Sequence, residues 1–299
     1  NTVAKVDAFI KSILSAAKYK QFKEEKEMDT SYSTPTGIRL RINCHYERGN
    51  SSLAARIIPD KVPSLEDIGI EDLEYLCDEK EGLILFTGPT GAGKSTSLAA
   101  MIQHIATHKG GHIVTLEDPV EFVFKSEKGL IRQRQLGRDF LEFPAALRGV
   151  LRQDPNIIMV GEMRDLETIA AALTLAETGH LVFATLHTPN AMQTIDRIVD
   201  VFPPHQQQQI RTQLSLSLRA IVAQRLVPCA HGGRTAQREV LINTPAVANI
   251  IRDNRTPELK SVLQTGRDTG MCTFGKHAKE LLKNGEIDKE TYEWMKNEG

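Results

Sequence analysis

The sequence predicts an α/β protein built on a mostly parallel sheet and preceded by a small α+β domain. From about residue 67 onward, short apolar runs typical of buried strands alternate with longer segments of helical periodicity. The strand candidates are residues 83–87, 112–116, 157–161 and 181–186. This alternation is the pattern of strand–helix–strand units, in which helices cover a parallel sheet.

The first 58 residues follow a different pattern. Residues 3–26 have the apolar spacing of a helix, and residues 38–44 alternate apolar and polar side chains as a half-buried strand does. Residues 53–58 form a second strand candidate, after which Pro59 and Pro63 interrupt the pattern. We therefore expect a small α+β domain at residues 1–58, a linker at 59–66, and a second domain at 67–299 that ends in a helical C-terminal region.

The composition limits the classes of function. Of 299 residues, 40% are hydrophobic and 25% are charged, which is typical of a soluble globular protein. The formal net charge of −1 does not favour a nucleic-acid partner. No apolar run reaches the roughly 18 residues of a membrane-spanning helix. Four scattered cysteines without a C-x-x-C pair argue against a zinc site or a disulfide framework and fit a reducing cytoplasm.

A glycine-rich motif lies between a strand candidate and a helical segment. Residues 88–95 read GPTGAGKS, the G-x-x-x-x-G-K-S pattern of the phosphate-binding P-loop; the alternative is a chance glycine-rich turn. Backbone N–H groups and the helix N-terminus can hold phosphate oxygens, Lys94 can reach the β- and γ-phosphates, and the Ser95 hydroxyl can ligate Mg²⁺. The predicted nucleotide-binding residues in and beside the loop are Gly88, Thr90, Gly91, Ala92, Gly93, Lys94, Ser95 and Thr96.

A carboxylate follows the apolar strand candidate at 157–161. In P-loop proteins a nearby strand delivers an acid beside Mg²⁺ and the γ-phosphate, so Glu162 is the predicted general base. The alternative is a surface acid at a strand end. Many P-loop enzymes have a magnesium-binding aspartate where this chain has Val160 or Gly161. We therefore expect metal contact through Ser95 and water.

Two further groups of polar residues accompany strand candidates. Glu117 and Asp118 follow the strand at 112–116 and could position water or Mg²⁺ if that strand ends beside the P-loop. For Asp118 the alternative is a helix N-cap, because Asp before Pro is common there. His180 and His187 flank the strand at 181–186. His187 could hydrogen-bond the γ-phosphate and His180 could contact the nucleotide, although a single histidine is more often structural.

Together, four blocks resemble those of the secretion ATPases, in the same order. The Walker A motif of that superfamily resembles GPTGAGKST, and its Asp box resembles TLEDPVE. Its Walker B motif resembles VGEMRDLET, and its His box resembles ETGHLVFATLHT. Within it, the chain most resembles the PilT family, the retraction ATPases of type IV pili. Three further segments support that choice: PSLEDIG, TIDRIVDVFP, and QTG at 264–266 with GM at 270–271.

The resemblance implies a homo-hexamer that hydrolyses ATP with Mg²⁺ at its subunit interfaces and works on an inner-membrane platform protein of a pilus machine. It implies a cytoplasmic protein, only peripherally associated with the membrane. It also implies that an arginine of the N-terminal domain acts on the γ-phosphate bound by a neighbouring subunit. The preferred candidates are Arg56 and Arg41, followed by Arg39 and Arg48. Arg152 and Arg164, in the predicted second domain at 67–299, are further candidates for this cation.

The chain also departs from the family pattern. The part before Val3 is short, so we expect a truncated N-terminal domain, and the AIRNLIRE-like segment at 246–253 lacks the arginine at its third position. Three alternatives to a retraction motor remain. A pilus-extension or type II secretion ATPase commonly carries a four-cysteine zinc module, which is missing here. A type IV secretion traffic ATPase and a non-hydrolysing regulatory subunit are the others.

Overall fold

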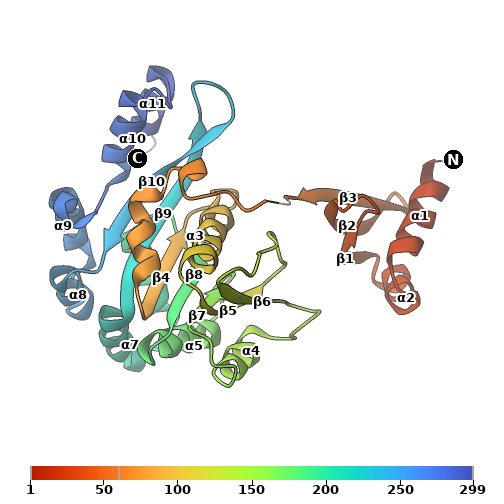
Figure 1. The fold of residues 1–299 in the computed structure, drawn as a ribbon, viewed down its shortest axis with the longest axis horizontal. Coiled ribbons are helices and arrows are strands. Elements are labelled where there is room, and N and C mark those ends of the chain that lie inside the picture. Colours follow the sequence, from red (N-terminus) through yellow and green to blue (C-terminus); the bar gives the residue numbers. More distant parts are fainter. Residues whose placement is uncertain (1, 60, 298–299) are drawn as a thin grey trace. The chain divides into compact units, whose positions relative to one another are not determined.

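The computed structural model describes residues 2–59 and 61–297, which form two compact units (Figure 1). The first comprises residues 1–61 together with 121–123, and the second comprises residues 62–120 together with 124–299. The division falls within the expected linker at 59–66, in which Asp60 lies outside the described residues.

The first unit packs two helices on one face of an antiparallel sheet. Its elements are α1 (Thr2–Ile13), α2 (Ala16–Glu25), β1 (Glu27–Ser33), β2 (Arg39–Glu47) and β3 (Asn50–Ile58), with sheet order β1-β2-β3. The buried centre consists of Ile10, Leu14, Phe22, Ile42 and Cys44. The prediction of one helix over 3–26 was wrong, because the Ser15 side chain accepts a hydrogen bond from the Lys18 N–H and starts a second helix.

The second unit is built on a seven-stranded sheet with order β10-β9-β4-β8-β7-β5-β6. Every pairing is parallel except that of β9 with β10. The strands are β4 (Gly82–Thr87), β5 (Gly111–Glu117), β6 (Gly129–Gln135), β7 (Ile157–Val160), β8 (Leu181–Leu186), β9 (Leu218–Pro228) and β10 (Arg234–Ile242). The predicted α/β class with a mostly parallel sheet is confirmed.

Helices cover both faces of this sheet, which explains why β4, β7 and β8 are buried at every residue. The helices are α3 (Lys94–His108), α4 (Phe143–Val150), α5 (Leu166–Glu177), α6 (Ala191–Asp200), α7 (Pro204–Ser217), α8 (Pro245–Arg252), α9 (Leu259–Thr265), α10 (Phe274–Lys283) and α11 (Lys289–Asn297). Short 3₁₀ helices span Glu66–Ile68 (η1), Glu71–Asp78 (η2), Thr256–Glu258 (η3) and Gly266–Thr269 (η4).

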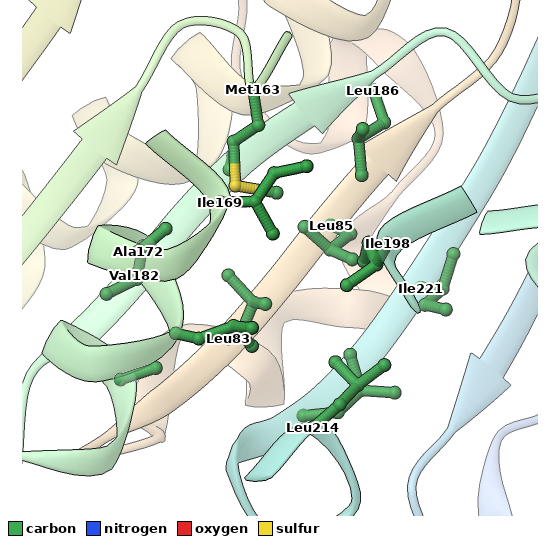
Figure 2. Packing of buried hydrophobic residues seen from close by; sticks show 14 of the residues in the cluster. Leu83, Leu85, Met163, Ile169, Ala172, Val182, Leu186, Ile198, Leu214 and Ile221 are labelled. Atoms are coloured by element: carbon green, nitrogen blue, oxygen red, sulfur yellow. The ribbon is translucent and has the colours of Figure 1, made fainter. Parts of the chain in front are cut away.

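Alternate residues of β4 point to opposite faces of the sheet. Leu83 and Leu85 belong to the larger apolar cluster, and Figure 2 shows them among residues from three helices: Ile169, Ala172, Ile198 and Leu214. Residues of α3, which contacts β4, β5, β6 and β8, do not belong to that cluster. The P-loop helix thus lies on one face, and α5, α6 and α7 lie on the other.

The C-terminal helices α10 and α11 form a smaller apolar cluster with Val227 of β9. Beside them His277 of α10 accepts a hydrogen bond at Nδ1 from the Arg238 backbone N–H, 3.3 Å away. Burial and, after it, the Arg238 charge lower the pKa of His277 from 6.5 to about 4, against a smaller opposing effect of Asp72. Within residues 2–59 and 61–297, no helix combines the length and the apolar character needed to cross a bilayer.

The depressed pKa of His277 predicts acid sensitivity of the fold. Between about pH 6.5 and pH 4 the unfolded chain binds a proton that the folded chain does not, so stability is lost as the pH falls, by up to about 3 kcal/mol. Urea unfolding at several pH values should therefore show a shallower pH dependence for His277→Gln than for the wild type. The exposed His205 offers a control: in His205→Gln the free energy of unfolding should depend on pH as steeply as in the wild type. An unchanged slope in His277→Gln would contradict the assignment.

Candidate nucleotide-binding and catalytic site

The P-loop connects the end of β4 to the start of α3. Gly88, Gly91 and Gly93 have φ angles of 140°, 79° and 83°, a region that side-chain-bearing residues rarely adopt. A Cβ at Gly88 would lie 2.1 Å from the Gln224 carbonyl oxygen, so the loop passes directly against β9. At Gly91 no atom lies within 4 Å of the corresponding Cβ position, which leaves space for a phosphate to approach the backbone.

Lys94 lies at the first position of α3, with only 8% of its surface exposed. Its Nζ donates hydrogen bonds to the carbonyl oxygens of Gly88, at 2.8 Å, and of Pro89, at 3.1 Å. The ammonium therefore lies over the loop, beside the positive end of a 15-residue helix. A nucleotide phosphate therefore fits the loop glycines, the helix N-terminus and the lysine together. The half-buried Ser95, in the first turn of α3, is the residue that would hold Mg²⁺.

Glu162 lies two residues beyond the last residue of β7. Its two carboxylate oxygens are both engaged: Oε2 is 2.7 Å from Arg164 Nη2, and Oε1 is 3.1 Å from His187 Nε2. The residue between strand and acid is Gly161, where a Cβ would lie 3.1 Å from the Leu116 carbonyl oxygen, a tighter contact than most. Thr185 also donates a hydrogen bond to the Gly161 carbonyl, which fixes this turn to β8.

The charges around Glu162 keep it ionised. Partial burial raises the pKa of Glu162, but the hydrogen bond and charge of Arg164 and the charges of His187 and Lys94 outweigh that effect and lower the pKa below 4.5. Arg164, in turn, has its pKa raised by the same hydrogen bond. A carboxylate that is ionised at neutral pH and within electrostatic reach of the P-loop lysine suits a general base.

Glu117 and Asp118 occupy different environments at the end of β5. The register pairs Leu116 with Val160, so Glu117 lies beside the turn that carries Glu162. Glu117 is 4% exposed and accepts hydrogen bonds from Thr115 Oγ1, at 2.7 Å, and from Gln133 Nε2, at 3.0 Å. Asp118 is exposed and precedes Pro119 across a cis peptide bond. No helix begins there, so the N-cap alternative for Asp118 was wrong.

The two histidines lie at opposite ends of β8. The parallel register pairs Leu186 with Thr87, so His187 shares an edge with the P-loop, and it contacts Glu162. His180 precedes Leu181, which pairs with Gly82 at the far end of β4, roughly 20 Å away along an extended strand. Its Nδ1 lies 3.1 Å from the Leu175 carbonyl oxygen. Within one chain, the assignment of His180 to the nucleotide is therefore wrong.

The predicted trans-acting arginines lie in the first unit. Arg41 of β2 is directly opposite Arg56 of β3. Both are on the sheet face opposite that of Ile42 and Cys44, which pack against the helices. They line a shallow hollow of about 510 Å³. The other residues that line it are Asp29, Asn43, Ala54 and Ala55.

Several polar residues at this edge were not predicted as site residues. Gln133 of β6 binds Glu117, and a chain of buried hydroxyls links Thr188, which follows His187, to Thr194 of α6 at 2.7 Å. Thr194 also reaches Thr87, the last residue before the P-loop, at 3.5 Å. The segment around Thr194 carries a family resemblance, but its sequence does not show that one hydroxyl would contact the end of β4.

Comparisons with known proteins agree with this geometry. The family model described as type II/IV secretion system protein matches residues 52–298. The chain belongs to this family. It is 46% identical over 286 residues to the type IV pilus retractation ATPase PilT of Pseudomonas aeruginosa, covering 95% of this chain and 83% of that protein. It is 45% identical to a twitching motility protein of Neisseria gonorrhoeae, over 94% of this chain and 76% of that one.

Two solved structures have the same fold as this chain. The crystal structure of the pilus retraction motor PilT with bound ADP is 44% identical, has a TM-score of 0.89, and is matched over 95% of this chain and 81% of that one. The ATPase DotB of Legionella pneumophila is 29% identical with a TM-score of 0.85, over 99% of this chain and 84% of that one. The resemblance to the PilT family that the sequence indicated is confirmed.

The position of Glu162 predicts a separation of binding from turnover. Glu162→Gln keeps the shape of the side chain but removes the base, so ATP affinity should stay within about threefold while kcat falls by two orders of magnitude or more. Isothermal titration and steady-state phosphate release measure the two quantities. Glu290→Gln, at an exposed acid in the first turn of α11, is the matched control and should keep wild-type kcat. A Glu162→Gln variant with undiminished kcat would transfer the role to Glu117 or Asp118.

Proposed function

We propose that this chain is an ATP-hydrolysing motor that drives type IV pilus retraction. The observation that carries the proposal is that Lys94, after β4, acts electrostatically on the ionised Glu162, after β7. Only β8 separates these two strands, and the fold matches ADP-bound PilT. Lys94 and Glu162 are the groups needed for binding and for turnover, and their presence together argues against a regulatory subunit that only binds nucleotide. Identity of 46% over 95% of the chain favours pilus retraction over the secretion alternatives.

The residues of the second unit divide the work of hydrolysis. P-loop N–H groups and Lys94 hold the phosphates, and Lys94 exchanges its contacts with Gly88 and Pro89 for phosphate oxygens. Glu162 accepts a proton from the attacking water while Arg164 and His187 hold its carboxylate in place. Ser95 would hold Mg²⁺, which when bound neutralises charge on the phosphates.

The working assembly that we propose is a homo-hexamer in which a neighbour's arginine completes each site. Transfer of a phosphoryl group needs positive charge beside it, and Arg164 of the second unit is already paired with Glu162. Arg41 and Arg56, side by side on the sheet face of the first unit that its helices leave open, are the candidates. The proposed partner of the ring is an inner-membrane platform protein of a pilus machine, which the cytoplasmic protein meets at the membrane surface.

Nucleotide binding depends on Lys94 in this proposal. Lys94→Ala removes the main cation at the β- and γ-phosphates and should lower ATP affinity by at least two orders of magnitude. Isothermal titration with ATP and Mg²⁺ measures the loss. Lys109→Ala, at the other end of α3, is a control that should retain wild-type affinity. Undiminished ATP affinity in Lys94→Ala would refute the P-loop assignment.

A trans-acting arginine predicts complementation between inactive variants. Lys94→Ala and Arg56→Ala should each hydrolyse little ATP alone. Mixed rings should recover part of the activity, because an intact P-loop can then face an intact arginine of its neighbour. The measurement is phosphate release at fixed total protein across mixing ratios, with Arg41→Ala as the next variant. Hydrolysis at the full rate by a strictly monomeric preparation would contradict the model and place the catalytic cation at Arg152 or Arg164.

A further inference from the structure

Gln224 of β9 is a buried polar residue directly behind the P-loop. Only 1% of it is exposed, and both ends of its amide are hydrogen-bonded. Its Nε2 donates to the Ala92 carbonyl oxygen at 2.7 Å, and its Oε1 accepts from Ser97 Oγ at 3.0 Å. The carbonyl of Ala92 can only accept, so the amide orientation is fixed by chemistry as well as by position.

The same residue also contacts the start of the loop. The register of β4 with β9 pairs Thr87 with Ala223, so Gln224 lies where β4 ends and the loop begins. The Gln224 backbone carbonyl lies against Gly88, and its Nε2 is 3.1 Å from the position of a Cβ at Gly93. One residue of a neighbouring strand thus contacts both ends of the loop.

The hydrogen bond to Ala92 orients a donor for phosphate. The Ala92 carbonyl and the Gly93 N–H belong to one planar trans peptide, in which they point in opposite directions. Because the carbonyl is held toward the Gln224 amide, the Gly93 N–H is turned away from that amide. If the Ala92 carbonyl were released, this peptide could rotate freely, since Gly93 has the backbone freedom to follow.

We propose that Gln224 is a positioning residue that holds the P-loop in its phosphate-binding conformation before the nucleotide arrives. The inference rests on the proposed nucleotide-binding function and adds a residue that none of the four sequence blocks contains. Gln224 does not contact the nucleotide; it acts through Ala92 and Gly93. Its loss reduces the fraction of loops that are competent to bind, and the apparent affinity falls by that fraction.

The test compares two buried glutamines of the same hairpin. Gln224→Met keeps the volume of the side chain and removes both hydrogen bonds. Gln237→Met is the matched control: Gln237 is also 1% exposed and doubly hydrogen-bonded, to Arg225 Nε and to the Phe274 carbonyl, but it lies away from the P-loop on β10. Both changes should lower the melting temperature of the nucleotide-free protein, since each leaves a buried partner unsatisfied.

Only Gln224→Met should affect nucleotide handling. Its Kd for ADP and its KM for ATP should rise about tenfold or more, while kcat at saturating ATP stays within about threefold, because bound phosphate restores the loop. Gln237→Met should keep wild-type Kd and KM. Gln224→Glu, which retains an acceptor for Ser97 but places a carboxylate against the Ala92 carbonyl, is the second variant if Gln224→Met does not fold, and it should weaken ADP binding at least as much.

Three outcomes separate the alternatives. Equal Kd values for the wild type and a folded Gln224 variant would overturn the positioning role while leaving the motor function standing. Equal losses of affinity in the Gln224 and Gln237 variants would also overturn it, because the effect would then be general destabilisation. A wild-type protein that binds neither ADP nor ATP would refute the proposed function itself, and the positioning role with it.

Discussion

The parallel pairing of β4 with β8 on one side and β9 on the other is the constraint on which the site depends. Thr87 is level with Leu186 and with Ala223, so β4 and β8 end at the same level, while β9 continues past them and stays paired with β10. The P-loop, His187 and Gln224 are the residues that follow. The strands are buried at nearly every position and covered by helices on both faces, so their ends are held by the core rather than by flexible loops. One-residue slippage of β8 would reverse the faces of its side chains.

Elements with a strong local signal could be predicted from the sequence, and elements defined by distant partners could not. The central strands at 83–87, 157–161 and 181–186 are short apolar runs, because helices cover both their faces. β6 is largely polar, and β9 follows α7 without any turn residue, so neither has such a signal. The error at His180 has a similar origin. His180 and His187 are close in the sequence, but the full length of the extended strand β8 separates them.

Buried amides show most clearly why the site could not be predicted in full. Gln133 and Gln224 look like ordinary polar residues in the sequence, and their roles arise only from partners on other elements, Glu117 and Ala92. Opposite Gln224 on β10 lies Arg238, whose guanidinium donates to the carbonyls of Ile68, at 2.6 Å, and Gly69, at 2.9 Å. At the position where Gln224 pairs with Arg238, the β9–β10 hairpin therefore contacts two segments. Gln224 binds the P-loop, and Arg238 binds the turn at residues 68–69 near the start of the second unit.

The charges at the strand ends support the proposal that a residue of another subunit completes the site. Lys94, Arg164 and His187 all act on Glu162, and a triphosphate must take Lys94 away from its contacts with Gly88 and Pro89. Arg164 is already held by Glu162 through Nη2, and moving its guanidinium to the phosphates would weaken the contact that lowers the pKa of Glu162. A cation supplied by the paired Arg41 and Arg56 of a neighbour would stabilise the transferring phosphoryl group and leave Glu162 oriented, so hydrolysis would be coupled to the arrival of the adjacent subunit.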